Sequence, residues 1–171
     1  MPALYDPEQV RPMWEELAAV GIRPLKSAQE VDAVLKDTAG TALVVVNSVC
    51  GCAAGGARPG VTLALQNDII PDELATVFAG MDTEATQRAR EYMANVQPSS
   101  PCIALFKDGK PLHVLERRHI ERMSALDIAN NLKEIFNQTC SRKGPSVPPE
   151  VFEANEHVEI CGSTLTRVNA Q

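Results

Sequence analysis

The sequence has few aromatic residues and no long hydrophobic run. Phe, Trp and Tyr make up 4% of the 171 residues, so the core must consist mainly of Val, Leu, Ile and Ala. Hydrophobic residues as a whole reach 44%, which is enough for a folded domain of this length. The absence of a stretch of about 18 apolar residues excludes a membrane-spanning helix. The first residues also lack the apolar segment of a signal peptide, and we therefore expect a cytoplasmic protein.

Clustered positive charge is missing as well. The formal net charge is −6, and the densest basic group, Arg117, Arg118 and Arg122, is interrupted by Glu116 and Glu121. A protein that neutralises the phosphates of a nucleic acid needs basic residues gathered on one face. We therefore expect neither a nucleic acid nor an anionic membrane as a partner.

Cysteines are present in an odd number and without a second closely spaced pair. In a chain without a signal peptide, this number argues against a secreted disulfide scaffold. A zinc site built from Cys50, Cys52 and Cys102 is a weaker alternative, because zinc usually takes four ligands and the three histidines are scattered. We expect no metal. The five cysteines are Cys50, Cys52, Cys102, Cys140 and Cys161.

Apolar periodicity and chain-breaking residues predict alternating helices and strands. An Asp108-Gly109 turn makes the last two strands antiparallel, whereas helical crossovers make the earlier pairs parallel. The result is an α/β fold, a mixed central sheet with helices on both faces. It should occupy residues 1–140, and residues 141–171 should form an extension that packs along the surface or is partly mobile. The predicted helices are 7–20, 27–38, 57–66 (with a kink at Pro59), 82–95 and 124–140, and the predicted strands are 22–25, 41–49, 74–78, 103–106 and 111–115.

The motif Cys50-Gly51-Cys52 lies where a buried strand ends and a helix follows. Free backbone N–H groups and the helix dipole at such a place favour a thiolate over a thiol, and the thiolate is the form that attacks a disulfide. A disulfide closed over one intervening residue is strained and labile, which suits exchange better than a structural role. Arg58 follows closely and is a possible source of further positive potential, but the sequence leaves its direction open. Two inert core thiols are the plainer alternative.

Pro101 is the second informative residue. It precedes a predicted strand and follows two serines. A cis Ser100–Pro101 bond would place this loop beside the cysteines, where its backbone groups would face a disulfide-bearing partner.

Four segments resemble the bacilliredoxins: NSVCGCAAGGARP at 47–59, PSSP at 98–101, ALFKDG at 104–109 and ERRHIE at 116–121. The resemblance covers roughly residues 5–140 and implies a thioredoxin-like fold, a three-layer α/β/α arrangement. It also implies an enzyme that removes bacillithiol from S-bacillithiolated client proteins, with bacillithiol as co-substrate and no tightly bound cofactor. Cys50 would be the nucleophile and Cys52 the second thiol, while Gly51, Ser100 and Pro101 (as the cis-proline) would bind substrate.

Two features depart from that family. Cys102 directly follows the proline and would be either another thiol near Cys50 or part of the core, and the extension carries Cys161. A general disulfide reductase or isomerase stays open as an alternative, as does a metal-binding or adaptor module. Other candidates are assigned structural or surface roles; they are Cys140, Cys161, His113, His119, His157 and Trp14.

Overall fold

The computed structural model describes residues 2–158, 165, 167 and 168. Its central sheet has five strands in the order β1-β4-β2-β5-β6, of which β1, β4 and β2 run parallel while β5 and β6 are each antiparallel to their neighbours. This mixed topology is that of the thioredoxin-like fold, as predicted. The strands are β1 (Arg23–Pro24), β2 (Thr41–Asn47), β4 (Glu73–Phe78), β5 (Cys102–Lys107) and β6 (Lys110–Leu115).

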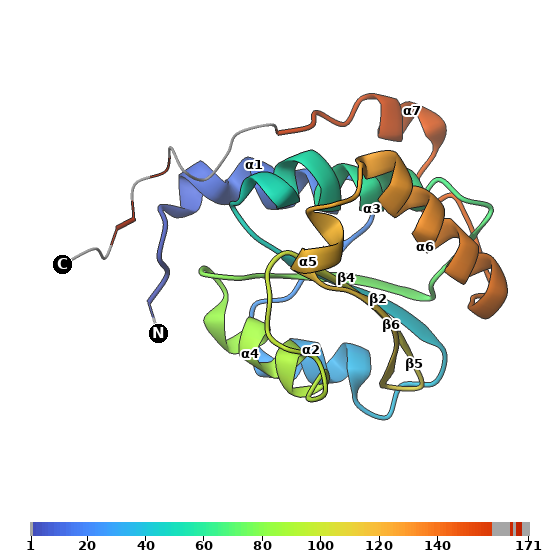
Figure 1. Cartoon of the computed structure of the whole chain (residues 1–171), viewed down its shortest axis with the longest axis horizontal. Helices are drawn as coiled ribbons and strands as arrows, with labels where there is room; N and C mark the ends of the chain where they lie inside the picture. Colours follow the sequence, from blue (N-terminus) through green and yellow to red (C-terminus); the bar gives the residue numbers. More distant parts are fainter. Residues whose placement is uncertain (1, 159–164, 166, 169–171) are drawn as a thin grey trace.

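Helices cover both faces of this sheet, because the central strand β2 is apolar on both sides. All seven of its residues are buried. Leu43 and Val45 pack in one core cluster, whereas Val44 and Val46 pack in another. One face carries α1 (Pro7–Ala18), α3 (Arg58–Ala64) and α6 (Ala125–Thr139), and the other carries α2 (Ala28–Leu35) and α4 (Thr83–Glu91) (Figure 1). Among the described residues, no helix has the length and apolar character needed to span a bilayer.

Helices α2 and α6 begin where the sequence predicts, whereas several element ends differ. Ser27 and Ser124 each form a capping box at these starts. Helix α2 ends at Leu35 rather than near residue 38, and Asp37 lies in the left-handed region with φ 53°. Strand β2 ends at Asn47 rather than Val49, because the Asn47 side chain accepts the Ser48 N–H and draws the chain out of the sheet.

The helical segment after β2 differs most from expectation. It begins at Gly51, well before residue 57, and runs as a π-helix over Ala53–Ala57 before continuing as α3. The Arg58 N–H bonds to the carbonyl of Ala53, five residues back. Pro59 has no N–H to offer, so the wide turn just before it accommodates the proline without a break in the helix.

The described part of the extension packs against the domain. Its strand β7 (Arg142–Lys143) pairs with β3 (Ile69–Ile70), and a short helix, α7 (Pro149–Glu153), follows. Farther along, Arg167 forms an isolated bridge with Tyr5 near the N-terminus. Cys161 lies outside the described residues.

Helix α3 packs closely against α6 at Gly60, which gives a test of the packing. A Cβ atom at Gly60 would lie 2.6 Å from Cγ2 of Ile128, whereas one at Gly55 would meet nothing within 4 Å. We expect Gly60→Ala to lower the free energy of unfolding by about 1–3 kcal/mol through overpacking. Gly55→Ala, the matched control, should be neutral or stabilising by up to about 1 kcal/mol. Urea unfolding of both variants measures the difference, and equal stabilities would contradict this account of the contact.

Candidate active site

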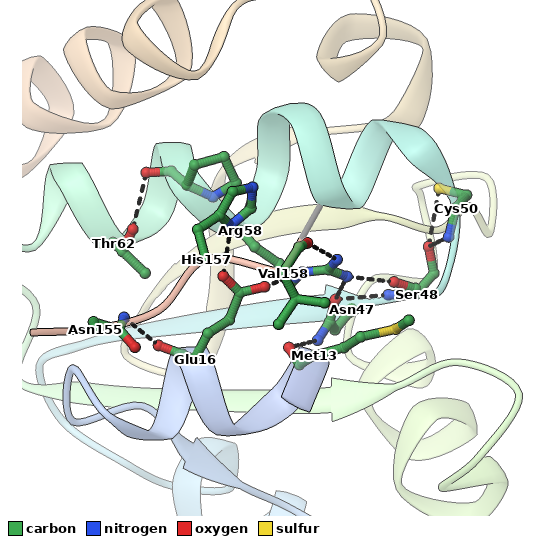
Figure 2. A network of polar contacts seen from close by, with 11 residues as sticks. Met13, Glu16, Asn47, Ser48, Cys50, Arg58, Thr62, Asn155, His157 and Val158 are labelled. Carbon is green, nitrogen blue, oxygen red and sulfur yellow. Dashed lines mark hydrogen bonds and ion pairs between the residues drawn. The ribbon is translucent and has the colours of Figure 1, made fainter. Parts of the chain in front are cut away.

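Cys50 lies at the start of the helical segment that follows β2. Its carbonyl accepts the N–H groups of Ala53 and Ala54 at 3.1 and 3.2 Å, so the helix begins at this residue. The Ser48 hydroxyl donates to Cys50 Sγ at 3.1 Å, and the Cys50 N–H reaches back to Ser48 Oγ at 3.4 Å (Figure 2). Cys50 is thus a half-buried residue at a helix start with a hydroxyl donor at its sulfur.

Cys52 has a different environment, although only one residue separates it from Cys50. Burial raises the pKa of the Cys52 thiol, and the neighbouring Cys50 raises it further. Its side chain packs against the core cluster beneath α3 and α6. The expectation of a favoured thiolate therefore does not hold for Cys52. Both are free thiols, but Cys50 lines a surface pocket whereas Cys52 packs against the core.

The proline loop lies beside Cys50. The Ser100–Pro101 bond is cis, and Ser100 and Cys50 line the same pocket of about 440 Å³. Gly51 lines a second pocket, of about 430 Å³, together with Gly55 and His157. Pro101 itself is buried. The structure thus gathers Cys50, Cys52, Gly51, Ser100 and Pro101 around one helix start, while their individual roles stay predictions.

A buried ion pair lies behind Cys50, and sequence reasoning missed it. The Arg58 side chain is fully buried and pairs with the carboxylate of Glu16 from α1 (Figure 2). Arg58 also donates to the Ser48 carbonyl at 2.8 Å and to Asn47 Oδ1 at 3.3 Å. Burial lowers the pKa of Arg58, while Glu16 and then Cys50 act in the opposite direction. The positive charge therefore acts near Cys50 from inside the protein.

The extension closes over this pair. His157 Nδ1 lies 2.7 Å from the second carboxylate oxygen of Glu16, and Asn155 donates to the Glu16 carbonyl at 2.8 Å. Arg58 donates in addition to the carbonyl of Val158 at 3.2 Å (Figure 2). His157 was expected only to lie in the extension, and its contact with Glu16 was not predicted. The one available signal was an acidic residue, Glu16, close to the apolar positions Met13 and Leu17 of the first helix.

Cys102, Cys140 and His119 lie in structural positions. Cys102 is 2% exposed, and burial raises the pKa of its thiol to about 12, so it belongs to the core rather than to the reactive thiols. Burial also raises the pKa of Cys140. His119 accepts the Glu116 N–H at 3.0 Å, a structural role as expected. Among the described residues, no three His, Cys, Asp or Glu side chains gather in a manner suited to a metal ion.

Comparison with known proteins gives a consistent family. The family model described as Disulphide isomerase matches residues 5–140. A bacilliredoxin of Salinibacter ruber is 49% identical over 143 residues, covering 82% of this chain and 84% of its own length. A bacilliredoxin of Staphylococcus aureus is 49% identical over 136 residues, covering 80% of this chain and 91% of its own.

Two solved thioredoxins are similar in structure. A variant thioredoxin from Halobacterium salinarum has a TM-score of 0.48 at 19% identity and covers 76% of this chain and 96% of its own. A thioredoxin from Fasciola hepatica has a TM-score of 0.47 at 18% identity, with coverages of 69% and 99%.

Because the ion pair behind Cys50 is buried, removing one partner should lower the free energy of unfolding more than removing both. Arg58→Met would leave the buried Glu16 carboxylate without its guanidinium, and we expect a loss of about 3–5 kcal/mol in the free energy of unfolding. The double variant Glu16→Gln/Arg58→Met buries no charge and should recover part of that loss. Arg118→Met, which breaks an exposed pair, should cost less than about 1 kcal/mol. Urea unfolding compares the three, and equal losses for Arg58→Met and Arg118→Met would contradict the burial argument.

The thiol environments predict an order of alkylation. In the native reduced protein at pH 8, iodoacetamide should modify Cys50 first and leave Cys102 unmodified. A pKa of about 12 for Cys102 leaves only about one thiol in 10⁴ ionised at that pH. Mass spectrometry of peptides taken over time measures the order, and the unfolded protein in urea is the control in which all cysteines react. Labelling of native Cys102 as fast as Cys50 would overturn the assignment.

Proposed function

This chain belongs to the bacilliredoxin family, the family described as disulphide isomerase, and we propose that it removes bacillithiol from S-bacillithiolated proteins through Cys50. The family and the thioredoxin-like fold make it a thiol–disulfide oxidoreductase. The finer assignment, with bacillithiol as co-substrate and no tightly bound cofactor, is the proposal. Its setting is the cytoplasm, where client proteins carry the mixed disulfides.

One observation carries the proposal: the two thiols of Cys50-Gly51-Cys52 are unequal. The Ser48 hydroxyl donates to Cys50 Sγ at 3.1 Å, and this sulfur lines an open pocket. The pKa of Cys52 is raised by burial. An exchange enzyme needs this division, because one sulfur must attack as a thiolate while the second acts only after a mixed disulfide has formed.

The proposed reaction begins with attack of the Cys50 thiolate on the bacillithiol sulfur of the mixed disulfide. The bond between bacillithiol and the client breaks, a bond between Cys50 and bacillithiol forms, and the client leaves as a thiolate that takes a proton from water. A free bacillithiol thiolate then attacks the bacillithiol sulfur on Cys50. This step releases the Cys50 thiolate and forms bacillithiol disulfide, so electrons and atoms balance with the small thiol as reductant.

Cys52 offers a second way to clear Cys50. Its thiolate attacks Cys50 Sγ, bacillithiol leaves, and an internal disulfide closes across Gly51. Two small thiols are then needed to reduce that disulfide. The strain of so small a ring favours this reduction.

A general disulfide isomerase or reductase is the second candidate, favoured by the family description Disulphide isomerase. The two candidates differ in substrate rather than in chemistry. Rates on one test protein carrying either bacillithiol or glutathione on the same cysteine separate them. A clear preference for the bacillithiol adduct supports the first candidate, and equal rates favour the second.

Cysteine variants test the proposed roles. Cys50→Ala should reduce release of bacillithiol from a bacillithiolated test protein to the rate without enzyme, because Cys50 is the one cysteine among the described residues that line the pocket. Cys52→Ser should still perform the first step and accumulate bacillithiol on Cys50. Mass spectrometry of enzyme and test protein follows both products. Full activity of Cys50→Ala would rule out the assignment, while circular dichroism of each variant checks that the fold is retained.

A further inference from the structure

Positive charge gathers in the pocket next to Cys50. Arg90 from α4, Arg117 from α5 (Arg117–Ile120) and Arg167 from the extension all line it. No Asp or Glu is among its described lining residues, although the chain as a whole carries a formal charge of −6. The charges at the reactive cysteine are therefore opposite in sign to those of the protein around it.

These three arginines lack acidic partners within the described part of the chain. Four other arginines, Arg11, Arg58, Arg88 and Arg118, pair with a carboxylate. Arg23, Arg122 and Arg142 do not pair with a described one. The Nε of Arg90 is buried without a hydrogen-bond partner among the described residues. The guanidinium of Arg117 makes one long contact of 3.4 Å with the carbonyl of Ser100, and its backbone N–H donates to Ser99 Oγ at 3.2 Å, so the residue lies beside the Pro101 loop. The guanidinium groups at the pocket are thus available to a ligand.

Backbone pairing brings the extension to this pocket. Arg167 bridges to Tyr5, and the Val168 N–H donates to the carbonyl of Leu4 at 2.9 Å. The Leu4 N–H in turn donates to the Gly80 carbonyl at 2.8 Å, next to the end of β4. Arg167 lies beyond residues 5–140, the part that the family model matches. The cation that Arg167 brings to the pocket therefore lies outside the segment that defines the family.

We propose that this pocket binds the carboxylate-bearing half of a small-thiol disulfide and directs its sulfur toward Cys50. Arginine is the side chain best suited to hold a carboxylate, and a volume of about 440 Å³ suits a small molecule rather than a polymer. The inference rests on the proposed function and extends it, since it names the charge by which the small thiol is recognised. The Cys50 thiolate attacks the sulfur held in the pocket, that disulfide bond breaks, and the other sulfur leaves as a thiolate.

A matched pair of disulfides isolates the charge: dithiodipropionate, with one carboxylate on each half, and its neutral diamide. Full-length protein with Cys52→Ser is used so that the mixed disulfide on Cys50 accumulates, and mass spectrometry gives the rate with each compound. The rate with the diacid is divided by the rate with the diamide. This ratio is then divided by the same ratio measured for mercaptoethanol in solution, which corrects for the different intrinsic reactivity of the two disulfides. We expect a normalised ratio of about ten or more, because only the diacid forms ion pairs with the arginines, and a fall in this ratio as salt is raised.

Charge-removing variants locate the effect. Arg90→Gln, Arg117→Gln and Arg167→Gln should each lower the normalised ratio about three- to tenfold. Arg167 is exposed, so its variant tests the site without a risk to folding. Lys110→Gln is the control for loss of one positive charge. In the strand register Lys110 lies opposite Lys107, and Lys107 lies opposite Thr41, the first residue of β2. Lys110 is therefore at the far end of the strands from Cys50, which follows the last residue of β2. The Lys110→Gln variant should keep the ratio of the parent protein.

The outcomes separate this inference from the proposed function. A normalised ratio near one, or a ratio that none of the three arginine variants lowers, overturns the anion site while leaving Cys50 as the nucleophile. Failure of Cys50 to react with either compound contradicts the proposed function and the anion site together.

Discussion

The ion pair between Arg58 and Glu16 is the interaction on which the active-site geometry depends. It joins the helix after β2 to α1, and the same guanidinium holds the Ser48 carbonyl and Asn47 Oδ1 at the end of the strand. A buried arginine is stable only when its donors are used, and the carbonyl of Val158 takes another of them. The turn that carries Ser48 and Cys50 is therefore fixed from behind by a charge that has no access to solvent.

That arrangement explains how one short motif can contain two unlike thiols. The turn presents Cys50 to the pocket with a hydroxyl donor at its sulfur, while the next helical residues carry Cys52 back toward the core. Cys102 is closer still to the interior, on β5, and its pKa of about 12 removes it from exchange chemistry. The reactivity of each cysteine in this protein thus depends on the environment in which the backbone places its sulfur.

The extension takes part in both sides of the site. Asn155, His157 and Val158 complete the network behind Cys50, and Arg167 enters the pocket in front of it. Asn155 and His157 contact Glu16, Val158 contacts Arg58, and Arg167 bridges to Tyr5. These residues of the extension therefore pack against the N-terminal part of the chain. A segment with no helical or strand periodicity in its sequence can therefore contribute to the stability and the ligand preference of the domain.

The sequence by itself determined the order of elements, their helix caps, the Asp108-Gly109 hairpin and the placement of Cys50 and Cys52 where a strand gives way to a helix. These features depend on near neighbours in the chain, through apolar period, capping and turn chemistry. Tertiary structure alone decided the partner of Arg58, the inert state of Cys102 and the meeting of Arg90, Arg117 and Arg167. Each of these features arises from burial or from contacts between distant segments. A local pattern of residues encodes neither the burial nor the contacts.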